Sequence, residues 1–106
     1  MIDYGDRPSN QSALPITDEA AFVQEIREWA KENKAAWEYY MIIVRTESAF
    51  GELSPNYPIQ ILRHRKHVSI RNAAAPILAR MAMEEDDSVR FRLAKSKYDA
   101  YFEVRL

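Results

Sequence analysis

The chain has 106 residues, a formal net charge of −1 and no cysteine, and 47% of its residues are hydrophobic. This length and apolar fraction are typical of one globular domain and exclude a mainly disordered chain. The lack of cysteine excludes a disulfide scaffold and a thiolate zinc site. The first residues are acidic and polar, and no apolar run approaches the roughly 20 residues that span a bilayer. We therefore expect a cytoplasmic protein without a membrane partner.

The near-neutral net charge is the sum of an acidic and a basic half of the chain. Residues 1–53 carry five basic and ten acidic side chains, net −5, whereas residues 54–106 carry ten basic and six acidic side chains, net +4. The stretch from Ser54 to Met83 contains basic residues and no acidic residue, and an acidic run at residues 84–87 follows directly. Such blocks are usually solvated faces that attract one another within the fold. The functional alternative is a basic surface for an acidic protein or a nucleic-acid backbone.

Residues 1–16 are polar and contain two prolines, which predicts a flexible N-terminal arm. Residues 17–106 are expected to form a single helical domain. Thr17 is the predicted N-cap of its first helix, because a threonine hydroxyl can accept from a first-turn amide. That helix is expected to run to about Asn33 or beyond. Its apolar positions recur at three- and four-residue spacing and are Phe22, Val23, Ile26, Trp29 and Ala30.

Residues 37–44 form a continuous apolar and aromatic run that periodicity cannot assign. Their aromatic and β-branched side chains favour a buried strand. The lack of turn residues beside the run, and of a clear strand partner elsewhere, favours a buried helix. We expect the helix, with an α+β fold containing a strand at 39–45 as the alternative. The two prolines in residues 51–58 should end the element.

Helical periodicity returns after Pro58. An apolar stripe then runs from Ile70 to Met81 and contains Pro76, so either the helix kinks there or a new helix begins with Pro76 near its first turn. Residues 86–88 offer capping oxygens for a further helix over residues 89–94. The predicted fold class is therefore mainly α, a small single-domain bundle of four to six short helices.

Three segments place an apolar residue directly before an arginine: residues 69–74, 88–94 and 103–106. The stretch from Leu78 to Ala94 contains a Leu-Ala pair, an acidic turn, a Val-Arg pair and a second Leu-Ala pair. In this it resembles HEAT-like repeats and the leucine-rich-repeat-variant family, over residues 68–106 at most. The resemblance implies HEAT-like helix pairs with an exposed face that binds proteins or nucleic acids without catalysis.

The residues that carry catalysis or hold metals are sparse. His64 and His67 can share a helix face, but two imidazoles among basic residues make an incomplete metal site. The acidic run lacks the glycine of a calcium loop, and capping with ion pairs to Arg80, Arg90 and Arg92 explains it better. Neither a glycine-rich phosphate loop nor a serine nucleophile elbow is present. We expect no catalytic residue, no metal, no cofactor and no enzymatic activity.

The predicted function is a noncatalytic macromolecule-binding protein, preferably a small protein–protein interaction module or an inhibitor of the immunity-protein, antitoxin or phage-encoded type. One alternative is a nucleic-acid-binding helical domain that uses the basic stretch 63–80, and another is a homo-oligomeric structural protein. Tryptophan and tyrosine are enriched at binding hot spots, so aromatic residues beside glutamates can form a site for a basic partner. The candidate partner-binding residues are Arg63, Arg65, Lys66, His67, Arg71, Arg80, Trp29, Trp37 and Tyr40.

Overall fold

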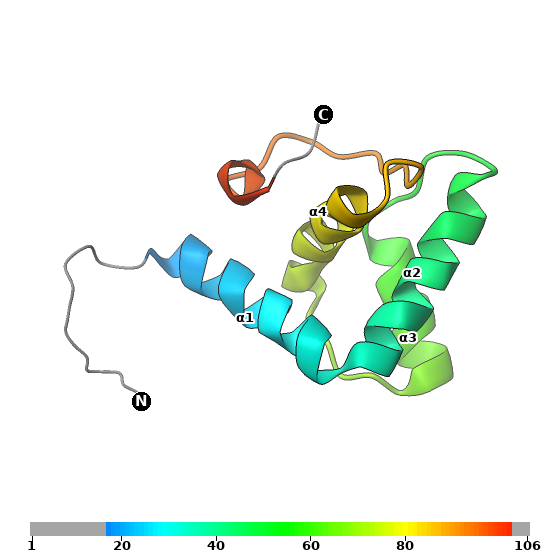
Figure 1. Cartoon of the computed structure of the whole chain (residues 1–106), viewed down its shortest axis with the longest axis horizontal. Helices are drawn as coiled ribbons and strands as arrows, with labels where there is room; N and C mark the ends of the chain where they lie inside the picture. The colour runs from blue at the N-terminus through cyan, green and yellow to red at the C-terminus, as the bar shows by residue number, and fades with distance from the viewer. Residues whose placement is uncertain (1–16, 103–106) are drawn as a thin grey trace.

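The computed structural model of the chain describes residues 17–102 (Figure 1). Its elements in chain order are α1 (Asp18–Glu32), α2 (Lys34–Ser48), α3 (Asn56–Lys66), the 3₁₀ helix η1 (Asn72–Ala74), α4 (Ala75–Glu85) and the 3₁₀ helix η2 (Asp99–Tyr101). The expected mainly α fold is confirmed, and within residues 17–102 the β structure amounts to one isolated bridge. The predicted arm at residues 1–16 and the segment 103–106 lie outside the described residues.

Helix α1 begins as its sequence predicts. The Thr17 hydroxyl accepts a hydrogen bond from the Ala20 amide at 3.1 Å, and two acidic residues in the first turn complement the positive end of the helix. Val23, Ile26 and Ala30 lie buried along one face. The amphipathic pattern therefore places both the start of this helix and the face that it buries.

Helices α1 and α2 meet at a sharp bend, the elbow, at Asn33 (Figure 1). The Asn33 amide and its side-chain Nδ2 both donate to the Trp29 carbonyl, and its own carbonyl accepts from the Trp37 amide. The ambiguous run at 37–44 is helical, so the expected helix is confirmed and the strand alternative at 39–45 is wrong. The apolar run has no helical periodicity because most of its side chains are buried or half-buried. Within residues 37–44, the exposed ones are Glu38 and Ile42.

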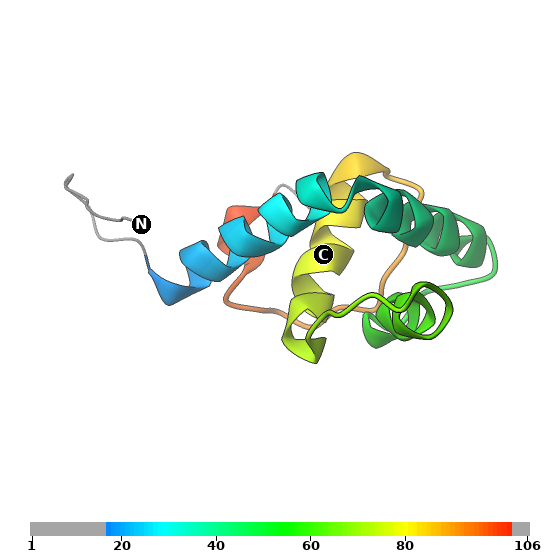
Figure 2. The same cartoon turned by 90° about the horizontal axis from the view of Figure 1, so that it is seen from below.

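Helix α3 packs against α2 and is drawn below it in Figure 2. It ends at His67, which takes a left-handed φ of 55° as the C-cap. The chain then runs without helix through residues 67–71, and the Nε of Arg63 donates to the Ile70 carbonyl at 3.0 Å. Helix α4 is a new helix rather than a kinked continuation, because Pro76 lies in its first turn, where its missing amide is not needed.

The helix expected over residues 89–94 is wrong. These residues belong to an extended stretch, the return segment (residues 86–98), which runs back along α4 towards α1 (Figure 1). The Leu53 amide donates to the Arg90 carbonyl at 3.0 Å, and the Arg92 amide donates to the Leu53 carbonyl at 2.8 Å. Val89 and Phe91 are buried at alternate positions, as in a strand. The resemblance of this stretch to helical repeats stays a prediction.

The return segment begins with a turn at residues 86–89, where the predicted helix would have started. The Asp86 Oδ1 accepts from the Ser88 amide at 2.9 Å and from the Ser88 hydroxyl at 2.7 Å. An aspartate carboxylate accepts such bonds in a turn as well as at a helix N-terminus, and here the Val89 amide also donates to the Asp86 carbonyl at 3.1 Å, which closes a turn. The capping oxygens are therefore present as predicted, but they close a turn.

Arg80 is buried in the core of the molecule, with 1% of its surface exposed. Its Nε donates to Asp99 at 2.6 Å, its Nη1 to the Pro76 carbonyl at 2.9 Å and its Nη2 to the Ala94 carbonyl at 3.0 Å. These bonds satisfy the guanidinium and hold the return segment against α4. The prediction that Arg80 contacts a partner is wrong, because the side chain is enclosed.

Tyr40 is also fully buried, so its predicted role as a contact residue is wrong as well. Its ring stacks on Trp37 with the centroids 5.2 Å apart. Its hydroxyl has no hydrogen-bond partner among the described residues, and burial raises the pKa of that hydroxyl. Tyr40 therefore supports Trp37 from within the core.

Candidate functional site

The predicted basic residues do not form one surface. Arg63 is committed to the Ile70 carbonyl, and Arg80 is buried. Arg71 lies over the ring of Phe22, 4.8 Å from its centroid, and reaches a carboxylate oxygen of Glu25 at 3.4 Å. Three of the predicted basic residues are exposed and adjacent at the C-terminal end of α3: Arg65, Lys66 and His67.

Two of these cations converge on an aromatic side chain of α2. The Lys66 Nζ lies 4.7 Å from the centroid of the Tyr39 ring, and the Arg65 Nη1 lies 3.4 Å from the Tyr39 hydroxyl oxygen. The guanidinium of Arg65 is charged at any physiological pH, as arginines are, and the hydrogen bond with Tyr39 raises its pKa further. Tyr39 therefore positions one ammonium and one guanidinium side by side.

A groove of about 400 Å³ lies next to this cluster. Ile42, one turn along α2 from Tyr39, lines it and is 58% exposed, which is unusual for so large an apolar residue. Val68 also lines it, from the chain that follows α3. We call the surface made by Tyr39, Ile42, Arg65, Lys66 and Val68 the basic–aromatic face.

A second, smaller groove of about 300 Å³ follows α1. Trp29 lines it together with Glu25, Glu28 and Glu32, so the structure does bring this tryptophan beside acidic residues. Arg71 pairs with Glu25 there and reduces the negative charge. Trp29 and Trp37 line different cavities, so the aromatic residues do not make a single site.

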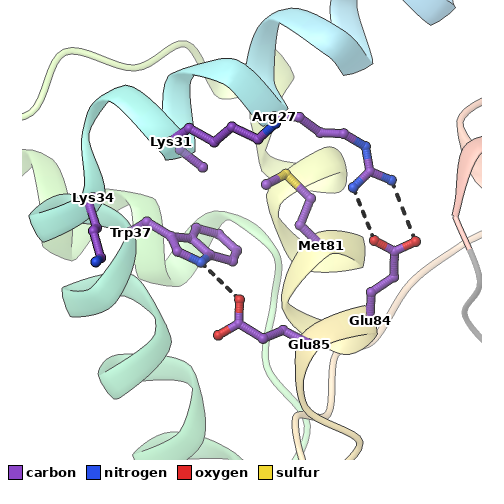
Figure 3. Close-up of a pocket in the computed structure, with 8 residues that line it drawn as sticks. Arg27, Lys31, Lys34, Trp37, Met81, Glu84 and Glu85 are labelled. Carbon is purple, nitrogen blue, oxygen red and sulfur yellow. Dashed lines mark hydrogen bonds and ion pairs between the residues drawn. The ribbon is translucent and has the colours of Figure 1, made fainter.

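A third cavity, the elbow pocket, has a volume of about 600 Å³ and lies where the bend at Asn33 faces the C-terminal end of α4 (Figure 3). The Trp37 Nε1 donates to Glu85 at 3.0 Å, and Arg27 reaches Glu84 at 3.2 Å. Its lining is mixed in chemistry and consists of Arg27, Ala30, Lys31, Lys34, Trp37, Met81, Glu84 and Glu85.

The acidic run at 84–87 is paired differently from the prediction. Glu84 pairs with Arg27, and Arg45 reaches Glu85 at 3.4 Å and Asp86 at 2.7 Å. The expected pairs with Arg80, Arg90 and Arg92 are wrong: Arg80 pairs with Asp99, Arg90 donates to the Ser48 carbonyl, and Arg92 lies 4.0 Å from Glu52. Hydrogen bonds from Ser88 and then Arg45 lower the pKa of Asp86 to about 2.

Sequence reasoning missed the elbow pocket, because Lys31 and Lys34 were not singled out. The available signal was the short break at Asn33, which turns two helices towards each other and places lysines on both sides of the bend. Within residues 17–102, no three side chains of His, Cys, Asp or Glu lie close enough to hold a metal ion. Nor does any helix in that range have the length and apolarity needed to cross a bilayer.

Comparisons of the chain with protein-family models, with curated proteins and with solved structures found no match.

Proposed function

We propose that this protein is a noncatalytic protein-binding module that recognises an acidic protein through its basic–aromatic face. The observation that carries the proposal is the arrangement of Arg65 and Lys66 around Tyr39, next to an exposed Ile42. Tyrosine and arginine are enriched among the residues that dominate binding energies, and the exposed apolar side chain of Ile42 beside Tyr39 offers surface for burial. An inhibitor of the immunity-protein or antitoxin type would be one form of such a module.

The charge of this face favours an acidic partner. Helix α3 contains no acidic residue, and its last turn consists entirely of basic or histidine residues. Among the residues that line the groove, Glu38 is the one acid. A positive surface of this kind accelerates association with a negative partner and disfavours a positive one.

The basic–aromatic face supports a protein partner better than a nucleic acid. Three of the six predicted basic residues, Arg63, Arg71 and Arg80, are engaged in contacts within the fold. The cations left at the end of α3 are too few to follow a phosphate backbone, which typically takes about six to ten contacts. The sequence pI near 6.1 is also far below that of most nucleic-acid-binding domains.

A site-specific crosslinking experiment tests this proposal. A photoreactive phenylalanine derivative replaces Ile42, and crosslinked products are collected from a lysate of the source cells. We expect one protein with an acidic surface, and we expect its yield to fall several-fold in the charge-reversal variant R65E/K66E. The matched control is R92E/K95E, which makes the same change in charge at exposed positions outside this face.

The outcomes separate the candidate functions. Equal yields in R65E/K66E and R92E/K95E contradict the proposal. Products that contain DNA or RNA, with an affinity that falls steeply as salt rises, support the nucleic-acid alternative instead. Crosslinks between two copies of this chain support the homo-oligomer, which light scattering at high protein concentration then measures.

A further inference from the structure

The two walls of the elbow pocket differ in how their charges are used. On the α4 wall, Glu84 pairs with Arg27 at 3.2 Å (Figure 3). Glu85 accepts from the Trp37 indole at 3.0 Å and pairs with Arg45 at 3.4 Å. Both carboxylates therefore have charged or polar partners from the protein itself, and this wall does not need a cation.

The opposite wall carries positive charge that the protein does not balance. Lys31 lies in the last turn of α1 and Lys34 is the first residue of α2. Among residues 17–102 neither ammonium group has an ion-pair partner. The positive end of the α2 dipole lies at Lys34 and the negative end of the α1 dipole lies at Lys31, so the two helix ends offset one another and the positive charge comes from the side chains. The unbalanced charge of this pocket is therefore positive and lies at the elbow.

Between the walls the pocket is apolar. Trp37 and Met81 face each other across it in Figure 3, and Ala30 contributes a small side chain from α1. The Trp37 ring is held by its stacking on the buried Tyr40 and by the hydrogen bond to Glu85. A fixed aromatic surface costs little further ordering when a ligand packs on it.

From these three observations we propose that the elbow pocket binds a small monocarboxylate with an aromatic or aliphatic body. Lys31 and Lys34 lie on either side of Trp37 in Figure 3, so the carboxylate meets the ammonium group of Lys31, and the apolar body packs against Trp37 and Met81. The volume of about 600 Å³ lies within the range of about 300–1,000 Å³ that is usual for small-molecule sites. This site is independent of the basic–aromatic face and does not rest on the function proposed for that face.

The acidic wall limits the charge of the ligand. A multiply charged phosphate would place negative charge near Glu84 and Glu85 as well as near the lysines. A monocarboxylate places its single charge at the elbow and its apolar part between the walls. A cationic ligand would meet the two unpaired ammonium groups, which repel it.

NMR titration of the whole chain with 3-phenylpropionate tests this inference. The protein has two tryptophans, so the indole N–H signal of Trp37 reports the pocket and that of Trp29 is an internal control. We expect the Trp37 signal to shift saturably, with a dissociation constant below about 1 mM. The uncharged analogue 3-phenylpropanol should bind about tenfold more weakly, because it lacks the contact with the ammonium groups.

The variant K31Q/K34Q should lose about tenfold in affinity for 3-phenylpropionate and retain its affinity for the alcohol. The control K95Q removes an exposed lysine outside the pocket and should bind as the unmodified protein does. All three lysines are exposed, so the variants should fold normally. The inference is overturned by equal affinity for acid and alcohol, by an unchanged affinity in K31Q/K34Q, or by no saturable shift at Trp37.

Discussion

Arg65 and Arg80 come from the same acid-free stretch of the chain and have opposite environments. Arg65 is exposed on the last turn of α3 and contacts the hydroxyl of Tyr39. Arg80 is 1% exposed and donates to Asp99 and to two backbone carbonyls. The difference teaches that charge density along the sequence does not separate an arginine that builds the fold from one that stays exposed on the surface.

The same contrast applies to the two halves of the chain. Within residues 17–102, ion pairs such as Arg27–Glu84, Arg45–Asp86 and Lys97–Glu19 join the acidic half to the basic half. Much of the charge division seen in the sequence is therefore used inside the molecule. The positive charge that these pairs leave unbalanced lies at the end of α3 and at the elbow, the two places where we propose binding.

The largest effect is expected from removing the buried arginine. The substitution Arg80→Met should lower the free energy of unfolding by about 3 kcal/mol, because it leaves Asp99 and two carbonyls without their donor. Urea denaturation followed by circular dichroism measures the change. A loss below about 1 kcal/mol would mean that Arg80 is not required for the fold and would remove the contrast with Arg65.

A smaller effect of opposite sign is expected in the core beside Trp37. The hydroxyl of Tyr40 is buried without a partner among the described residues. Tyr40→Phe should therefore raise the free energy of unfolding by about 1 kcal/mol, since the cost of burying a lone hydroxyl disappears. The same denaturation experiment measures it, and a destabilised variant would show that the hydroxyl has a partner in the folded protein.

The acidic turn should make stability depend on pH. Hydrogen bonds lower the pKa of Asp86 to about 2, so its contribution is complete above the ordinary carboxyl pKa and is lost as the pH falls towards 2. The unmodified protein should be more stable than D86N at pH 6, and this advantage should shrink between about pH 4 and pH 2. Urea midpoints of both proteins across this range measure it. A difference that does not change with pH contradicts the assignment.

The smallest effect is expected at the basic–aromatic face. The double substitution R65A/K66A should change the free energy of unfolding by less than about 0.5 kcal/mol, because both side chains are exposed and make contacts that water readily replaces. Thermal denaturation beside R80M provides the comparison. A loss as large as that of R80M would show that these cations serve the fold rather than a partner.

Much of the helical fold follows from local sequence. The cap at Thr17 and the spacing of Val23, Ile26 and Ala30 define α1, and the position of Pro76 marks the start of α4. Local sequence fails in the return segment, because Val89 and Leu93 suit a helix as well as a strand. The bonds that decide between them come from Leu53, far away in the chain.

The candidate sites could be predicted less well than the fold. The grouping of Arg65, Lys66 and His67 follows from their neighbouring positions on one helix end. The burial of Arg80 depends on Asp99 and Ala94, which reach it only when the return segment folds back. The elbow pocket depends on the angle between two helices, and no spacing of residues within one helix encodes such an angle.

The last part of the described chain packs on the first. Tyr98 lies against Phe22, the Arg27 guanidinium donates to the Tyr101 carbonyl, and the hydroxyls of Tyr101 and Thr17 lie 3.1 Å apart. During synthesis, α1 therefore leaves the ribosome long before the residues that cover it. Helices α2 and α4 cover part of its apolar side, and the remaining part stays open to chaperones or to premature association until residues 98–102 have emerged. The packing of α1 is therefore completed only when residues 98–102 join it.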